Sequence, residues 1–144
     1  MQVERARSAD THAIERLLTA AALPLDGAAE AFGTGLVARD GEVIVGAAAI
    51  EPYGDVGLLR SVVVAPERRG SGIGARLLAA SETLASELGI DELYLLTDTA
   101  EAWFAGRGYE QIERDHVPAR VRTSIEFTTA CSDSAKAMKR RLGS

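Results

Sequence analysis

Apolar residues recur at two different spacings in the first quarter of the chain. Alternation over residues 2–7 is typical of a short β-strand. Ser8 or Asp10 can then cap a helix, which we expect to end before Pro24. The apolar positions that keep helical spacing in between are Ile14, Leu17, Leu18 and Ala21. Residues 26–32 form a weaker helical pattern.

Three apolar runs separated by turn residues come next. The runs span Gly35–Arg39, Glu42–Pro52 and Val56–Val64. Asp40-Gly41 joins the first two and is a strong hairpin signal, because glycine tolerates the positive φ that tight hairpin turns require. A turn near Gly54-Asp55 joins the last two. We therefore predict an antiparallel meander whose third strand ends before Pro66, since proline has no N–H for a sheet ladder.

Helical and strand patterns alternate in the second half of the chain. Helical spacing over residues 72–88 places five apolar residues on one stripe, namely Ile73, Leu77, Leu78, Leu84 and Leu88. Residues 92–97 are predicted to be a strand buried on both faces. Asp98, with Glu101 three residues later, predicts the capped start of a short helix that runs to Arg107. The remaining predictions are a strand at 109–114, a helix at 118–131 and, with a helix as the alternative, a final strand at 135–142.

Composition and charge narrow the class of protein. With 144 residues, of which 47% are hydrophobic, the chain can bury one sizeable core, and we predict a single domain over residues 1–144. A net charge of -5 provides no broad positive field for nucleic acid. Neither a signal peptide nor a run of about 18 uncharged apolar residues is present, which indicates a cytoplasmic protein with no membrane partner. Cys131 lies far from His12 and His116 in sequence, so we expect no metal.

A predicted strand runs through a glycine-rich loop into a predicted helix at residues 62–75. Such a junction points backbone N–H groups outward at a helix N-terminus, where the helix dipole also favours an anion. Glycines at positions 70, 72 and 74 remove side chains that would keep phosphate groups at a distance. Arg68 and Arg69 add positive charge nearby. The loop is therefore a candidate pyrophosphate cradle.

Two other classes of phosphate loop fit less well. A P-loop ends in Gly-Lys-Ser/Thr, whereas Gly74 is followed by Ala75-Arg76. Gly70, Gly72 and Ala75 do satisfy the dinucleotide-binding spacing. The loop nevertheless follows a predicted meander, midway along a chain that is too short for a doubly wound sheet.

The same segment resembles the acetyl-CoA motif of the GNAT acetyltransferase superfamily, whose core is Arg/Gln-x-x-Gly-x-Gly/Ala. The matching residues are Val62, Val64, Pro66, Glu67, Arg69, Gly70, Gly72, Ile73, Gly74, Leu77 and Leu78. The stretch Ala100-x-x-Trp103-Phe104-x-x-x-Gly108-Tyr109 looks like the family's second signature. The resemblance implies an α/β (α+β) fold in which helices flank a mainly antiparallel central sheet of six to seven strands, splayed at the motif strand.

The resemblance also implies how acetyl-CoA would bind. The backbone of Val62 and Val64 would pair with the pantetheine arm, and an N–H near Val62 would stabilise the thioester oxygen as it gains charge. Thr97 could bond the pantetheine or only cap the next helix. The pyrophosphate would lie over Arg69, Gly70, Gly72, Gly74 and Ala75, with Arg68 close by.

The implied reaction is attack of a neutral amine on the acetyl thioester. A base is needed because an alkyl amine has a pKa of about 10. Glu51 is the base we expect among the titratable groups near the meander. Phe104, which we expect to contact the cofactor, stands where many family members carry a tyrosine as general acid. Tyr53, Ser61 or solvent would therefore protonate the departing thiolate, or no dedicated acid is needed. Because a phenyl ring donates no proton, a CoA-binding protein without catalysis is the alternative from another functional class.

The acceptor is less well defined by the sequence. Arg60 could hold an acidic group of a small amine, or form an ion pair with Asp55 or Glu51. Thr99 could line the same cleft or only cap a helix. At a finer level, three segments resemble a GNAT subgroup linked to arsenic resistance, namely residues 58–61, 94–102 and 117–127. That resemblance implies an acidic amino-acid-like acceptor, such as an organoarsenical or a phosphinic amino acid, and family habit implies a homodimer.

Overall fold

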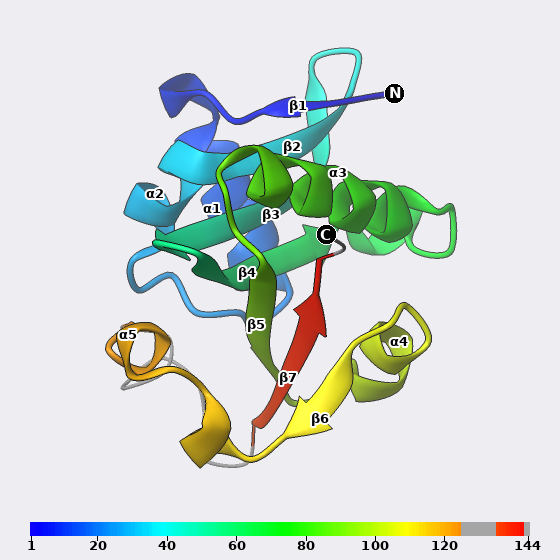
Figure 1. Ribbon diagram of the computed structural model, residues 1–144. Helices are drawn as coiled ribbons and strands as arrows, with labels where there is room; N and C mark the ends of the chain where they lie inside the picture. The colour runs from blue at the N-terminus through cyan, green and yellow to red at the C-terminus, as the bar shows by residue number, and fades with distance from the viewer. Residues whose placement is uncertain (125–134, 143–144) are drawn as a thin grey trace.

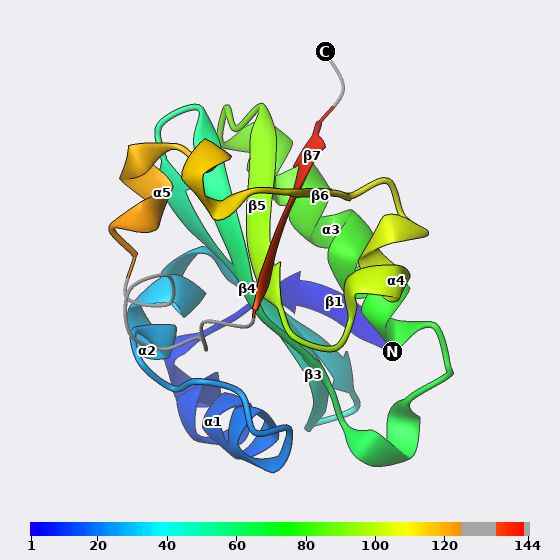
Figure 2. The ribbon, with the colours of Figure 1, turned by 90° about the horizontal axis from the view of Figure 1, so that it is seen from below.

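The computed structural model describes residues 1–124 and 135–142 of the chain. Its helices and strands are β1 (Gln2–Arg5), α1 (Thr11–Ala20), α2 (Ala28–Ala31), β2 (Gly35–Asp40), β3 (Val43–Tyr53), β4 (Val56–Val64), α3 (Ile73–Glu87), β5 (Glu92–Thr97), α4 (Glu101–Ala105), β6 (Glu110–Ile112), α5 (Ala119–Arg122) and β7 (Lys136–Arg141). In Figure 1, α3 crosses in front of the strands while α1 and α2 lie behind them. Figure 2 shows the sheet between α1 and α3, so helices cover both of its faces.

The described strands form one seven-stranded sheet in the order β1-β2-β3-β4-β5-β7-β6. Every neighbouring pair is antiparallel except β4 and β5, which are parallel. The predicted meander corresponds to β2, β3 and β4, and β7 lies between β5 and β6. This arrangement confirms the mixed, mainly antiparallel sheet with flanking helices that the sequence predicts.

The sheet opens between β4 and β5. These strands pair only where Val56–Leu58 meets Glu92–Tyr94. Beyond that point, residues 59–64 of β4 have no register partner on β5, and residues 95–97 of β5 pair with β7 alone. In Figure 1, β5 accordingly leaves β4 at a steep angle and runs down the page. The predicted splay is therefore present, at the strand that carries the motif.

Side chains from the two faces of the sheet enter different cores. On β3, Ala48 and Ile50 pack in the cluster beneath α3, together with Leu77 and Leu78 of that helix. Ala47 and Ala49 belong to the cluster beneath α1 and α2, which also contains Ile14 and Leu18. A third cluster joins β4, β5 and β7 to Val121 of α5 and to Val117, which precedes that helix. The alternation of adjacent residues between these cores follows from the two-residue repeat of a strand.

Most predicted elements are found where the sequence placed them, and β4 and β5 have the predicted bounds. The final segment forms a strand, β7, rather than the alternative helix. Leu88 departs from its prediction, because it is 41% exposed instead of lying in the core stripe. Helix α3 ends at Glu87, so Leu88 lies at its C-cap, beyond the last turn that packs on the sheet.

The start of α4 also differs from its prediction. The helix begins at Glu101 with Ala100 as its N-cap, so Asp98 does not cap it and Glu101 is not its third residue. Thr97 takes over part of this role, because its hydroxyl oxygen accepts a hydrogen bond from the Ala100 N–H at 3.0 Å.

The predicted helix at residues 118–131 is short in the described part of the chain, where only Ala119–Arg122 is helical. The rest of that prediction, with Cys131, lies outside the described residues. Within the described ranges, no helix is both long and apolar enough to cross a bilayer. The same residues contain no group of three or more potential His, Cys, Asp or Glu metal ligands.

Candidate functional site

The loop between β4 and α3 adopts a conformation that only glycine takes without strain. Gly70 has a φ of 82° and Gly72 a φ of 86°, both in the left-handed region. Gly72 is the N-cap of α3, and no side chain caps that helix end. A Cβ added at either glycine would meet no atom within 4 Å, so the bend is open. The first N–H groups of α3, which lack partners within the helix, thus lie beside an accessible glycine loop.

Charged side chains around this loop have different roles. The Arg68 guanidinium donates to the Asp40 carboxylate, with an Nη1–Oδ2 distance of 2.7 Å, and this hydrogen bond lowers the pKa of Asp40. Arg68 therefore ties the loop to the turn between β2 and β3. The Ser71 hydroxyl donates to the Arg68 carbonyl. Arg69 is exposed, so its side chain is accessible from solvent beside the glycines.

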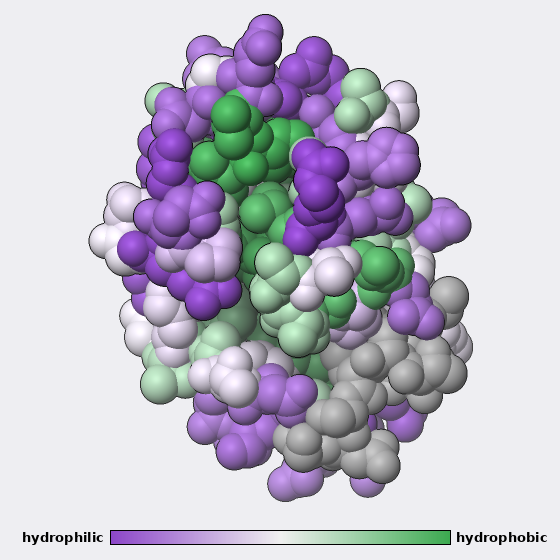
Figure 3. All heavy atoms as spheres, turned by 180° about the vertical axis from the view of Figure 1, so that it is seen from behind, coloured by the Kyte–Doolittle hydropathy of each residue, from purple (hydrophilic) through white to green (hydrophobic). Residues whose placement is uncertain are grey.

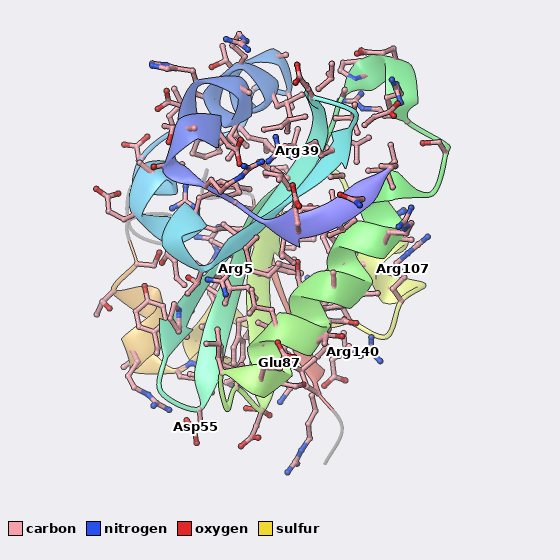
Figure 4. The ribbon with its side chains drawn as sticks, turned by 90° about the horizontal axis from the view of Figure 1, so that it is seen from above. Arg5, Arg39, Asp55, Glu87, Arg107 and Arg140 are labelled. Atoms are coloured by element: carbon pink, nitrogen blue, oxygen red, sulfur yellow. The ribbon has the colours of Figure 1, made fainter. Side chains whose placement is uncertain are left out.

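Trp103 of α4 forms a wall next to the start of α3. A Cβ added at Gly74 would lie 3.4 Å from Cζ2 of Trp103 and 3.7 Å from Cγ2 of Val64. The Arg107 guanidinium lies 4.0 Å from the Trp103 ring centroid, and Figure 4 shows Arg107 on the α4 side of the molecule. Trp103 belongs to the second sequence signature, yet the sequence alone did not single it out as a site residue.

Phe104, the neighbour of Trp103, is 6% exposed and belongs to the core beneath α3. Its ring meets Trp103 edge-on, with centroids 4.9 Å apart, and meets Tyr109 at 5.5 Å. The structure therefore places this position, predicted to contact the cofactor, inside an aromatic cluster.

A β-bulge interrupts β4 at the edge of the opening. Ala47 pairs with Val63 and Ala49 with Arg60, so Ser61 and Val62 together face Ala48 alone. Ser61 has a φ of 58°, which is unusual for a residue other than glycine. A bulge leaves its extra residue out of the ladder and bends the strand. Since β5 does not pair with β4 here, the bulge adjoins the splay.

A network of hydrogen bonds centres on the carboxylate of Glu51, on β3. The Arg60 Nη1 donates to Oε2 at 2.9 Å, and the hydroxyls of Tyr53 and Ser124 each donate to Oε1 at 2.6 Å. Burial acts to raise the pKa of Glu51, but the hydrogen bonds from Ser124, Tyr53 and Arg60 outweigh it and hold that pKa below its ordinary value. Glu51 is therefore an anion at neutral pH.

Two hydroxyls complete the network. Burial and the bond to Glu51 raise the pKa of Tyr53 to about 12, so this phenol keeps its proton. Ser124 is 3% exposed and reaches Glu51 from the end of α5. No local sequence signal identifies Ser124 as a site residue, because 73 positions separate it from its partner.

Arg60 forms the ion pair with Glu51 that was one of its predicted alternatives. Its side chain is fully buried, and its Nε also donates to the Ser61 hydroxyl oxygen at 3.1 Å. Asp55, the other predicted partner, pairs with Arg120 instead. Arg60 lies opposite Ala49, whose side chain faces α1 and α2, so the network lies on that face of the sheet.

The remaining predicted residues lie on the far side of the opening. Thr97 ends β5 and pairs with Lys136 of β7, and its hydroxyl is engaged at the start of α4. Thr99 follows in the connection to α4 and is exposed.

Figure 3 shows the face that carries α1 and α2, where hydrophobic side chains gather in a band between hydrophilic ones.

Comparison with known proteins adds a family match and structural neighbours. The model of the acetyltransferase (GNAT) family matches residues 4–109. An amino-acid acetyltransferase from Ralstonia nicotianae is 38% identical over 85 residues, which are 58% of this chain and 19% of that protein. The chain thus spans about a fifth of the length of this curated relative.

Two solved structures share the fold. N-acetylglutamate synthase from Neisseria gonorrhoeae, complexed with coenzyme A and N-acetyl-glutamate, superposes with a TM-score of 0.86 at 24% identity, covering 99% of this chain and 35% of the other. Rv2747 from Mycobacterium tuberculosis, in complex with CoA and NLQ, gives a TM-score of 0.83 at 27% identity and covers 99% of this chain and 100% of the other.

Proposed function

We propose that this chain, which belongs to the acetyltransferase (GNAT) family, is an acyltransferase that transfers the acetyl group of acetyl-CoA to the amine of a small amino acid. The single observation that carries the proposal is the opening between β4 and β5, bordered by the bulge at Ser61-Val62 and continued by the open glycine loop. A gap of this kind can take an extended ligand arm as a substitute for strand pairing.

The loop residues would hold the pyrophosphate of the donor. Backbone N–H groups at Gly70, Gly72, Gly74 and Ala75 would donate to its oxygens, with the exposed Arg69 as the nearby cation. The paired Arg68 would act mainly by fixing the loop against Asp40. Val62 and Val64, which have no partner strand on the β5 side, would offer their backbone to the pantetheine arm.

The bulge supplies the electrophilic side of the reaction. The bound donor brings a thioester carbonyl, on which negative charge grows as the amine attacks. A backbone N–H of Ser61 or Val62 would donate to that oxygen, because the bulge frees an N–H beside the opening. No proton needs to move for this stabilisation.

The Glu51 network would bind the amine of the acceptor and accept its proton. The ionised carboxylate attracts the ammonium form, and we retain Glu51 as the group that receives its proton, directly or through water. Its lowered pKa makes it a weak base. Both of its oxygens already accept hydrogen bonds, so the amine must displace the Ser124 or Tyr53 hydroxyl to reach it. Tyr53 suits orientation better than thiolate protonation, since an ordinary thiol has a pKa of about 8.5 and that of Tyr53 is about 12.

The finer acceptor class is an α-amino acid with a second acidic group, including organoarsenical and phosphinic amino acids. Support comes from the arsenic-resistance resemblance of residues 58–61 and 94–102 and from the amino-acid acetyltransferase relative. Arg60 is buried in its ion pair, so an acidic acceptor would compete with Glu51 for this guanidinium. Thr99 would contact the acceptor from the opposite side of the opening.

Thiol release from acetyl-CoA, measured with a panel of neutral, acidic and arsonate- or phosphinate-bearing amino acids, tests the proposal. We expect turnover with at least one α-amino acid and none with its N,N,N-trimethyl analogue, whose quaternary nitrogen has no lone pair. Binding of acetyl-CoA without turnover on any amine would contradict the proposal and favour the non-catalytic CoA-binding protein, in line with the buried phenyl ring of Phe104.

A further inference from the structure

The bulge that borders the opening has a side-chain support of its own. Ser61 holds a left-handed backbone, with a φ of 58°. A residue with a Cβ reaches this region only at an energetic cost, so the surrounding structure must hold it there. The described contact that does so directly is the hydrogen bond from the Arg60 Nε to the Ser61 hydroxyl oxygen, at 3.1 Å.

Arg60 is itself held rigidly. Its guanidinium is fully buried, and its Nη1 donates to Glu51 at 2.9 Å. Glu51 is fixed in turn by the hydroxyls of Tyr53 and Ser124. A chain of hydrogen bonds therefore runs from β3 through Arg60 to the bulge, and a planar guanidinium transmits its orientation along that chain.

We propose that Arg60 and the Ser61 side chain are positioning residues, which fix the bulge so that its backbone N–H points at the acyl carbonyl of the bound donor. This inference rests on the proposed function. It gives Arg60 a role other than gripping the acceptor, and Ser61 a role other than protonating the thiolate. Both roles act through backbone geometry rather than through contact with the reacting atoms.

Two substitutions of Ser61 separate positioning from chemistry. Ser61→Ala removes the hydroxyl but keeps the Cβ, so the left-handed backbone loses its support. Ser61→Gly also removes the hydroxyl, but glycine adopts a positive φ without strain. Positioning predicts that the glycine variant is rescued and the alanine variant is not. A proton-donating hydroxyl would leave both variants equally impaired.

The first readout is binding, which needs no acceptor. Each variant is titrated with acetyl-CoA and with S-ethyl-CoA, a thioether that lacks the carbonyl oxygen, while the emission of the single tryptophan, Trp103, is followed. Wild type should bind acetyl-CoA about fivefold more tightly than the thioether, the equivalent of one net hydrogen bond. Ser61→Ala should lose this preference, and Ser61→Gly should keep it.

The second readout is turnover. Ser61→Ala should lower kcat by about tenfold or more with little change in the KM for acetyl-CoA, because small displacements of a catalytic donor are costly. Ser61→Gly should recover most of the kcat that Ser61→Ala loses. Arg60→Met should resemble Ser61→Ala, and its effect on the binding preference should shrink in the Ser61→Gly background.

Arg39→Met is the matched control. Like Arg60, Arg39 donates side-chain hydrogen bonds to two residues, here the carboxylates of Glu4 and Asp10, and Figure 4 shows it between β2 and α1. Its loss should lower the Tm and leave the binding preference intact. The inference is overturned if wild type shows no preference for acetyl-CoA, if Ser61→Ala keeps it, or if Ser61→Gly loses it. Absence of turnover in wild type would contradict only the proposed function, since the binding preference is measured without an acceptor.

Discussion

The carboxylate of Glu51 and the guanidinium of Arg60 meet at 2.9 Å across neighbouring strands, and the arginine side chain is fully buried. An ion pair removed from water interacts more strongly than one on the surface, because less solvent screens it. The pair also lies between the core of the sheet and the bulge of β4. We therefore expect the interaction between Glu51 and Arg60 to stabilise the fold more than an exposed ion pair does.

We expect strong coupling between these two residues in a double-mutant cycle. Glu51→Gln and Arg60→Met should each destabilise the fold, and the double variant should lose less than the sum by about 1–3 kcal/mol. Urea denaturation at pH 7 measures the three losses. The exposed pair Asp55 and Arg120, with side chains 63% and 55% exposed, is the control and should couple by less than about 1 kcal/mol. Equal coupling in the two cycles would contradict the expectation.

The stabilising effect of Glu51 should depend on pH in the acid range. Its pKa in the folded protein lies below the ordinary value, so at acid pH the folded protein binds fewer protons at this carboxylate than the unfolded chain does. The contribution is then fully present above the unfolded pKa and is lost as the pH falls through the folded one. The Tm difference between wild type and Glu51→Gln should be constant near pH 7 and shrink below about pH 4.5. A difference that grows on acidification would reverse the assigned sign.

Substitution of Gly72 should impair binding of acetyl-CoA and modestly destabilise the fold. Gly72→Ala places a Cβ on a backbone with a φ of 86°, a cost of about 1–2 kcal/mol. Gly89 is a matched control, because it has a φ of 82°, equally open surroundings and a place at the far end of α3. Gly89→Ala should lose similar stability in thermal melts. Only Gly72→Ala should weaken acetyl-CoA binding in a Trp103 emission titration, and equal affinities in the two variants would argue against the cradle.

Introducing a tyrosine at position 104 should not improve catalysis. Phe104→Tyr introduces a hydroxyl at a ring that is 6% exposed and packed edge-on against Trp103 and Tyr109. Burying that group should cost about 1–3 kcal/mol, because it must give up its bonds to water. Thermal melts and kcat measured side by side check this. A raised kcat would show that this ring reaches the departing thiolate.

The order of elements was largely predictable from sequence, because its signals are local. Asp40-Gly41 between apolar runs predicts a hairpin, and β2 and β3 meet there. The glycine loop likewise combines strand, turn and helix signals within residues 62–75. Leu88 was misplaced because helical periodicity continues past the residue where α3 stops packing on the sheet.

The site was less predictable, because its chemistry depends on register. The pairing of Ala49 with Arg60 brings that arginine beside Glu51, and only the bulge at Ser61 produces this alignment. Serine has no marked preference for a positive φ, so the sequence contains no sign of the bulge. Ser124 joins the network from a distant part of the chain, a contact that no spacing rule predicts.

The gap between β4 and β5 divides the sheet into two blocks. One block contains β1, β2, β3 and β4, and the other contains β5, β7 and β6. Among the described strands, these blocks share only the ladder between Val56–Leu58 and Glu92–Tyr94. That ladder is the hinge line of the sheet, and side chains in the core beneath α3 and in the cluster at α5 also pack across it. A donor lying in the gap would brace the molecule, so occupancy should be visible as slower amide hydrogen exchange on both sides of the hinge, far beyond the atoms that react.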